Sequence, residues 1–552
     1  MKLKNILYSM MMGTAVLTGT TSCVSDLDQY PHKETTSKDV YTSLANYEAV
    51  LGKIYAAMVT SGQGKGGDNK DMESVLNNGS GFDYMRMFIN MQECGTDEFA
   101  STWLTGEQTT GLTYLSWDAN DAWVSDMYYR IYYNIALCNE FLRNANSASF
   151  SGADAEKMKE YKAEVRFMRA LFYYHALDFY RNIPMVTEND PVGSYIPPRY
   201  TPQQTFDYIE SELKDCVGDM LPASTCPYGQ ASQGAAYTLL AKLYLNSEVY
   251  TGVAKYAECK EACKKVMDMG YSLESDYSKL FNADNDKRTN EIIFALPVSA
   301  EHTVSWGSST YLVCGQVSMS NANQNVADYG VTAGWSEFRL RPEFVDKFTQ
   351  TDIDGGGDKR CKFFTNGQSK DVTSMTDETT GYLSEKWSNL KDDGTTASNT
   401  ADAGVETDYP LFRLADVYLM YAECVARLGE DWDNWDGGSD AEAATRKEGA
   451  IYYINKVRER AYGDAEHNVW KDNFASDADF LQFILDERAR ELYHEGYRRT
   501  DLIRFGEFTT NKYIWQWKGG THDGQAVDSK YNIYPIPNTE LTANPNLHND
   551  NY

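Results

Sequence analysis

The residues of this chain that could carry out chemistry do not form a recognised catalytic pattern. Its seven histidines include no H-E-x-x-H sequence and no close pair, so a catalytic zinc site is not predicted. No G-x-S-x-G elbow and no Walker loop occurs. The glycine-rich run 62–67 has the form of a dinucleotide fingerprint, but it follows a helical segment and leads into no helix. We therefore interpret it as a flexible loop.

The 80 acidic side chains are too numerous for the sequence to single out a catalytic pair. A glycosidase needs two carboxyl groups at a defined separation beside one bond, and such a pair stays an open alternative. Two acid-rich turns, at 284–286 and 431–440, could offer oxygen ligands to calcium. Neither has the complete spacing of a dedicated calcium loop, so we interpret both as solvated turns.

The N-terminus has the order of a secretory signal. Lys2 and Lys4 precede an apolar stretch at 6–17, and small residues at 19–22 precede Cys23. The stretch is shorter than the roughly 20 apolar residues of a membrane-spanning helix, so we expect the signal to be removed. The order resembles the processing site of bacterial lipoproteins, in which the cysteine becomes acylated, although Thr20 stands where leucine is usual. An ordinary signal peptide with an incidental cysteine is the alternative.

Charge and cysteine usage narrow the possible partners. The net charge is −29, and it becomes −31 when the two lysines of residues 1–22 are removed. Such a surface repels nucleic acid and anionic lipid, so we exclude DNA and RNA as ligands. No C-x-x-C occurs, and the nine cysteines after Cys23 are an odd number that cannot all pair. We expect most of them to be buried thiols.

The elements that must position any site are mainly helical. Glycine or proline follows several predicted helices, at Pro184, Gly270, Gly429 and Gly496. Helix pairs joined by short links predict an α-solenoid or tetratricopeptide-like stack, although no repeat of fixed period is found. The segments with the 3.6-residue apolar period of a helix are 121–144, 155–181, 202–217, 233–245, 256–269, 411–428, 448–461 and 479–495.

Two long segments do not have this helical period. Residues 61–118 and 271–407 are rich in Gly, Ser, Thr, Asn and Asp, with a short β-like run at 291–296. Loops of this length in a compact protein are usually functional or disordered. Their tryptophans argue against disorder, and these are Trp103, Trp306, Trp335 and Trp387.

The C-terminal third contains specific motifs. They are YPLFRLAD at 409–416, which we expect to open a helix, ERAREL at 487–492 and EGYRRTDLIRFG at 495–506. These motifs resemble the SusD/RagB family of outer-membrane lipoproteins, and the resemblance extends from Cys23 to YPIP at 534–537. We interpret the Glu and Arg residues of 487–504 as ion pairs and caps that lock the last helices together, rather than as ligand contacts.

Within the family, the sequence is most similar to the starch-binding member. The runs that carry this similarity are LFNADND at 280–286, STYLVCG at 309–315 and TTNKYIWQWKGG at 509–520. The resemblance implies a non-catalytic protein on the exterior face of the outer membrane, anchored by lipid on Cys23. It would capture starch or maltooligosaccharide (α-1,4-glucan) for a SusC-like TonB-dependent transporter. The alternatives are specificity for a different polysaccharide, or a scaffold that only clamps its transporter.

The resemblance also carries three tryptophans into a ligand site. Trp103 and Trp335 match aromatic ligand contacts, and Trp306 replaces a tyrosine that contacts ligand. Aromatic rings suit the apolar C–H faces of a neutral sugar, and loops braced by rigid helices can present them. The alternative for each of the three is burial under a loop.

Polar contacts and departures from the family pattern follow from the same comparison. Arg86 matches an arginine that bonds sugar hydroxyls, and Asn78 takes the place of an aspartate. Ser101 and Gly106 stand where the starch-binding member has a second tryptophan and a ligand-bonding asparagine. We therefore expect a thinner aromatic arc, with a different affinity or preferred glucan conformation.

A calcium site is implied in the same way. Asp286, Glu406 and Asp408 align with acidic ligands of a calcium site in the starch-binding member. Three oxygen donors from two distant segments could join the loops through one ion. This ion is the one cofactor that the sequence suggests.

The expected fold is mostly α, a tetratricopeptide-like helical-repeat scaffold with long irregular loop-rich insertions that carry the ligand site. A chain of 552 residues can bury a large core and allows two to four units. The predicted segments are 1–22 signal peptide, 23–60 N-terminal anchor and first helix, 61–120 loop-rich ligand-binding segment, 121–270 helical scaffold, 271–407 loop-rich ligand-binding insertion, and 408–552 C-terminal helical scaffold and tail.

Overall fold

The computed structural model describes residues 37–62, 64, 71–72, 75–77, 82–399, 404–432, 449–550 and 552. The chain divides into two compact units, residues 1–49 and 50–552. Helix α2 (Ser37–Val40) lies in the first unit, and α3 (Leu44–Ala56) begins there and ends in the second. The predicted signal peptide and the predicted lipidation site Cys23 lie outside the described residues.

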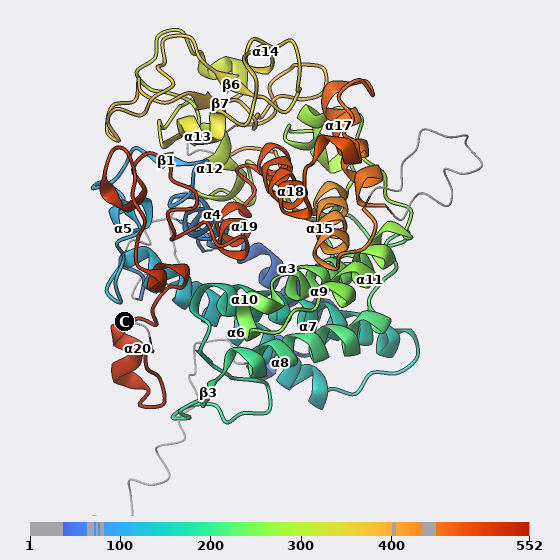
Figure 1. Ribbon diagram of the computed structural model, residues 1–552. Coiled ribbons are helices and arrows are strands. Elements are labelled where there is room, and N and C mark those ends of the chain that lie inside the picture. The colour runs from blue at the N-terminus through green and yellow to red at the C-terminus, as the bar shows by residue number, and fades with distance from the viewer. Residues whose placement is uncertain are drawn as a thin grey trace, which may run out of the picture. The chain divides into compact units, whose positions relative to one another are not determined.

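The second unit contains all eight helices that the apolar period predicted. Within it, α6 packs on α7, α7 on α8, α9 on α11, and α11 on α15, which also contacts α17 and α18 (Figure 1). A mainly helical scaffold of successively packed helices is therefore confirmed. The eight helices are α6 (Ala122–Ser147), α7 (Ala153–Tyr180), α8 (Pro202–Cys216), α9 (Gln233–Leu245), α11 (Tyr256–Met267), α15 (Leu414–Arg427), α17 (Ala450–Tyr462) and α18 (Asp477–Leu492).

Local sequence signals explain where these helices begin. Thr201 accepts a hydrogen bond from the backbone N–H of Gln204, whose side chain accepts from the Thr201 N–H in return, and Pro202 occupies the first helical position of α8. Asp121 and Ser232 cap α6 and α9 in the simpler way, through side-chain oxygens that accept backbone N–H groups. Each cap satisfies donors that the first turn of a helix leaves without intrahelical partners.

The strands are short and pair in twos. β4 (Ile292–Leu296) pairs antiparallel with β8 (Tyr409–Arg413), so the β-like run at 291–296 is confirmed. The motif at 409–416 opens α15 only with its last three residues, because its first five residues form β8. The other strands are β1 (Ala100–Ser101), β2 (Ile183–Pro184), β3 (Arg199–Tyr200), β5 (Phe338–Arg339), β6 (Phe363–Phe364) and β7 (Leu383–Ser384).

Shorter helices complete the unit, and several lie in the segments that lacked a helical period. The longest of these is α4, within 61–118, and α12 lies within 271–407. Both segments were read from the sequence as non-helical, and at these positions that interpretation is wrong. The shorter helices are α4 (Tyr84–Glu93), α5 (Thr110–Tyr114), α10 (Ser247–Thr251), α12 (Ser308–Gly315), α13 (Pro342–Val345), α14 (Gln350–Ile353), α19 (Arg498–Arg504) and α20 (Asn538–Ala543).

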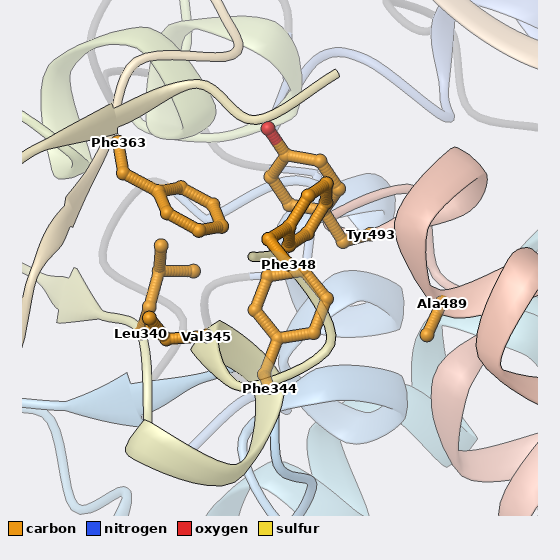
Figure 2. Packing of buried hydrophobic residues seen from close by; sticks show 7 residues of the cluster. All are labelled: Leu340, Phe344, Val345, Phe348, Phe363, Ala489 and Tyr493. Carbon is orange, nitrogen blue, oxygen red and sulfur yellow. The ribbon is translucent and has the colours of Figure 1, made fainter. Parts of the chain in front are cut away.

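An apolar cluster attaches the loop-rich insertion to the scaffold. Figure 2 shows the rings of Phe344, Phe348 and Phe363 gathered against Tyr493, which follows α18. The Phe344 and Tyr493 ring centroids are 5.1 Å apart, and Phe348 meets Phe363 edge-on at 5.1 Å. Buried aromatic contacts of this kind contribute beyond the apolar area that they bury. The described part of the insertion is therefore packed on the helices.

A buried charge cluster joins the last helices to β8. Arg413 bonds Glu291 at 3.1 Å, Glu491 at 2.5 Å and Glu495 at 2.7 Å. The ion pairs and burial of this cluster confirm the structural interpretation of Glu487, Glu491 and Glu495 in the C-terminal motifs. We call the following residues the charge cluster: Glu291, Arg360, Lys386, Arg413, Arg460, Glu487, Glu491 and Glu495.

Two further properties hold for the described residues. None of their helices is long and apolar enough to cross a bilayer. Their nine cysteines are all free thiols, and seven of them are buried, as the sequence predicted. The six segments proposed from the sequence stay a prediction, although residues 50–552 form one compact unit.

Candidate functional site

Three tryptophans from distant segments line one pocket. Strands β1 and β5 pair antiparallel, and the N–H of Thr102 donates to the carbonyl of Glu337 at 2.8 Å, which brings Trp103 and Trp335 together. The pocket has a volume of about 450 Å³. We call it the tryptophan pocket, and its lining residues are Phe82, Arg86, Trp103, Glu107, Trp306, Cys314, Met319, Thr332, Ala333, Trp335, Glu337 and Asn399.

Trp103 is held from two sides while its ring stays accessible. Its side chain is 37% exposed, and its indole Nε1–H donates to the carbonyl of Trp335 at 3.0 Å. Gly106 lies beside the ring, where an added Cβ would stand only 3.0 Å from Cε3 of Trp103. A side chain at position 106 would therefore press on the indole. The glycine permits this ring position.

Trp335 lies in a tight turn before β5. Its N–H donates to the carbonyl of Cys314 at 2.9 Å, and the next residue, Ser336, has a left-handed backbone with φ of +50°. This conformation is uncommon for a residue other than glycine and costs about 1–3 kcal/mol. The N–H of Ser336 donates to the carbonyl of Val317 at 2.9 Å, which holds the turn in place.

Trp306 is 39% exposed and precedes α12. The buried carboxylate of Asp83 fixes its segment, because Oδ2 accepts from the hydroxyl of Ser305 at 2.6 Å and Oδ1 accepts from the N–H of Ser308 at 3.2 Å. A Cβ at Gly307 would lie 2.1 Å from Oδ1 of Asp83, so only glycine fits between them. The N-terminal end of α4 therefore positions Trp306.

Arg86 lies on α4 beneath the pocket and is only 2% exposed. Its Nη1 donates to the carbonyl of Trp306 at 2.7 Å, and its guanidinium carbon lies 4.1 Å from the Phe82 ring centroid and 4.2 Å from that of Tyr311. The contact of Arg86 with sugar hydroxyls stays a prediction. The arrangement gives Arg86 a second role, which is to hold the backbone of Trp306.

Two carboxylates complete the base of the pocket. Nη2 of Arg86 bonds Glu107 at 2.5 Å and Glu337 at 3.1 Å. Burial raises the pKa of Glu337 to about 8, although Arg86 opposes the shift, and Glu107 adds to it. Two acids share one arginine, so the base of the pocket has no net positive charge whether Glu337 is protonated or ionised. A neutral sugar suits this base better than an anionic one.

Several lining residues were not identified from the sequence. Glu107 and Glu337 are each within four residues of a predicted tryptophan, so closeness to Trp103 and Trp335 is a signal that could have found them. Met319 and Asn399 lie in polar runs where no local pattern distinguishes them. Only the tertiary fold brings these two residues to the pocket.

Two of the positions named from the sequence do not line the pocket. Ser101 is buried in β1, where its hydroxyl bonds that of Thr109 at 2.9 Å. Gly106 instead supports Trp103 from outside the pocket lining. Asn78, predicted as a ligand contact, lies outside the described residues.

The three carboxylates predicted to bind calcium are near one another. Burial raises the pKa of Asp408 to about 7, and the nearby Asp286 and Glu406 also raise it. Oδ1 of Asp408 accepts from the N–H of Val298 at 2.7 Å, and Oε1 of Glu406 accepts from that of Ala300 at 3.1 Å. The oxygen donors suit calcium in type. Across the described ranges, however, no three His, Cys, Asp or Glu side chains meet closely enough to hold a metal ion, so calcium stays a prediction.

Comparison with known sequences finds related proteins along the whole chain. A family model described as "SusD family" matches residues 358–552, and one described as "Starch-binding associating with outer membrane" matches residues 27–245. The chain is 32% identical to Starch-binding protein SusD of Bacteroides thetaiotaomicron, with 99% of both chains covered. It is 26% identical to SusD-like protein P25 of Formosa agariphila, with 78% of both covered.

Solved structures share the fold. A SusD-like carbohydrate-binding protein from Bacteroides fragilis has a TM-score of 0.69 at 18% identity, with 92% of this chain and 100% of that chain covered. Surface glycan-binding protein A from Bacteroides thetaiotaomicron, solved in complex with laminarihexaose, has a TM-score of 0.66 at 17% identity, with 92% and 99% covered. The family models and the full-length identity to SusD show that the chain belongs to the SusD family.

Proposed function

We propose that this protein binds starch or maltooligosaccharide, an α-1,4-glucan, in the tryptophan pocket and does not modify it. The observation that carries the proposal is the meeting of Trp103, Trp306 and Trp335 at one pocket of about 450 Å³. Exposed aromatic rings are costly to leave in water unless a ligand covers them. The C–H faces of glucose units are apolar, so they can cover the rings, while the hydroxyls remain free for polar groups.

The choice of glucan rests on the full-length relative. That relative is named a starch-binding protein, and it is 32% identical over 99% of this chain. The base of the pocket has no net positive charge, because Arg86 is paired with Glu107 and Glu337, and this favours an uncharged ligand over an anionic one. Binding without catalysis is the expected activity, because family members of this kind capture glycans and do not cleave them.

We also propose a location and a partner. A lipid on Cys23 would hold the protein at the exterior face of the outer membrane, and a SusC-like TonB-dependent transporter would receive the glucan. The family model that covers residues 27–245 is described as associating with the outer membrane, which supports the proposed location. The signal-like order of residues 2–23 supports the lipid.

A binding panel tests the proposed function. Isothermal titration and affinity gels would compare maltoheptaose, amylose and pullulan with laminarin and other neutral and anionic polysaccharides. Saturable binding to the three α-glucans is expected, with release of no reducing sugar. Binding only to another polysaccharide would show that the fold serves a different glycan. Binding to none at millimolar concentrations would favour the transporter-clamping scaffold.

A further inference from the structure

Met319 lines the tryptophan pocket beside the three tryptophans. It is 56% exposed, more than Trp103 or Trp306, and all three line the same pocket. Single exposed apolar side chains are ordinary, but a group of them around one hollow marks an interaction site. The exposure of Met319 therefore needs the same explanation as that of the tryptophans.

The backbone of Met319 is fixed to the turn that carries Trp335. Its N–H donates to the hydroxyl of Ser336 at 2.7 Å, and that hydroxyl donates to a carboxylate oxygen of Glu378 at 2.8 Å. Two residues earlier, the carbonyl of Val317 accepts from the Ser336 N–H. The strained turn thus sets Met319 and Trp335 together. An exposed, mobile loop would not hold a methionine in this way.

The pocket also has a polar edge that is held in place. Oδ1 of Asn399 accepts from the N–H and the hydroxyl of Thr332, at 3.0 and 2.8 Å. Its Nδ2 donates to the carbonyl of Gly404 at 2.8 Å. An amide nitrogen has two hydrogens, and this bond uses one. The pocket therefore presents apolar groups beside a polar edge, which is the division that a sugar ring requires.

We infer that Met319 is a fourth sugar-contacting residue, which packs its thioether on the apolar C–H face of a glucan unit beside Trp335. The inference rests on the proposed function and extends it. Ser101 is buried and Gly106 bears no side chain, so neither position supplies a further ring to the pocket. A methionine fills the wall with an unbranched side chain that adapts its shape. The pocket consequently tolerates glucans of different curvature.

Titrations with maltoheptaose and with amylose test the inference. Met319→Ala is expected to weaken binding about fivefold, since only part of a methionine side chain is newly covered by ligand. Met319→Leu should retain most of the affinity, because it keeps apolar volume. Val253→Ala is the matched control, since Val253 is also 56% exposed but lies away from the pocket. It should bind as wild type does.

Methyl NMR gives a direct readout of contact. With methionine methyl groups labelled, the Met319 resonance, assigned by its loss in Met319→Leu, should shift with maltoheptaose and saturate at the same concentration as the calorimetric signal. The methyl of Met420, buried in α15, should not move. Wild-type binding with an unmoved Met319 resonance and full affinity in Met319→Ala overturns this inference alone. Failure of wild type to bind either glucan overturns the proposed function as well.

Discussion

The charge cluster and the tryptophan pocket lie in one compact unit but are built by opposite means. In the charge cluster, ionised side chains from β8, α17 and α18 are removed from water and satisfied by one another. In the pocket, apolar rings are left partly in water and held by hydrogen bonds to their own backbone and edges. The first arrangement stabilises the fold, and the second leaves surface for a ligand.

The electrostatics of the charge cluster agree with a structural role. Burial alone would raise the pKa of Glu491, but Arg460, Arg413 and Arg360 outweigh it and lower the pKa to about 2. Because the folded-state pKa is below the ordinary value of 4.5, the stabilisation is present above that value and is lost as the pH falls towards 2. At neutral pH the cluster is fully ionised at this position. The motifs that resemble the family therefore indicate the scaffold of the protein more than its ligand.

Breaking the charge cluster should have the largest effect. Arg413→Met leaves Glu291, Glu491 and Glu495 without their shared cation, and the free energy of unfolding should fall by about 3–5 kcal/mol in urea titration. Arg413→Lys keeps the charge and should lose less, although it cannot form the same set of bonds.

An exposed ion pair gives the control for that change. Lys159 on α7 bonds Asp219 at 2.7 Å, and both side chains contact water. Lys159→Ala should leave the urea midpoint unchanged. Equal losses of stability in Arg413→Met and Lys159→Ala would contradict the distinction between buried and exposed pairs. The folded fraction of Arg413→Lys should bind maltoheptaose as wild type does.

A change in the tryptophan pocket should weaken glucan binding and leave stability nearly unchanged. Trp103→Ala should weaken maltooligosaccharide binding by about 2 kcal/mol, or about thirtyfold in Kd, because an aromatic hot spot is removed. Stability should change little, since the ring is partly exposed. Calorimetry measures the first quantity and urea titration the second.

A second exposed tryptophan, outside the pocket, gives the control for Trp103→Ala. Trp470 is 39% exposed and does not line the tryptophan pocket, so Trp470→Ala should leave Kd unchanged. Wild-type affinity in Trp103→Ala would show that the ligand site lies elsewhere. Equal weakening by both variants would show that binding is unspecific stacking on the surface.

Filling Gly106 should have a smaller effect on the same ring. In Gly106→Asn the added Cβ would stand only 3.0 Å from the Trp103 ring. The indole must then tilt, and its hydrogen bond to the Trp335 carbonyl must lengthen. Affinity for maltoheptaose should fall about tenfold, or about 1.4 kcal/mol. Unchanged or tighter binding would show that the asparagine makes a compensating contact with sugar.

The sequence predicted the scaffold well because its helices are long enough to show an apolar period. The apolar period identified long helices such as α7, whose first half meets water, and α8, which buries one face. It missed α4 and α12, which are only ten and eight residues long and lie within segments rich in Gly, Ser, Thr, Asn and Asp. Helix α4 carries Arg86, and helix α12 follows Trp306.

The pocket was predicted in part. Resemblance named Trp103, Trp306, Trp335 and Arg86, and the structure brings these four residues together. The resemblance could not name Met319. The position of Met319 at the pocket depends on the hydrogen bond from its N–H to the hydroxyl of Ser336, and no local sequence pattern shows this bond. Nor could the resemblance find that Arg86 is paired with two acids, since ion pairs between distant segments leave no local pattern.

Calcium is expected to have the smallest effect. Extracellular calcium modules commonly bind with Kd values of about 10⁻⁴–10⁻³ M, so 1 mM calcium should add about 0.4–1.4 kcal/mol to the free energy of unfolding at pH 8. The effect should shrink at pH 5.5, because Asp408, with a pKa of about 7, is then mainly protonated and cannot act as an ionised ligand.

The control for calcium removes one ligand and keeps its shape. Asp408→Asn should abolish the calcium dependence at pH 8, while magnesium, which is smaller and dehydrates reluctantly, should act weakly on wild type. Unfolding that is independent of calcium at pH 8 would show that Asp408 and Glu406 only join the loops, through the backbone N–H groups of Val298 and Ala300. Glucan affinity measured with and without chelator then separates this site from the pocket, because loss of calcium should weaken binding only if the loops move.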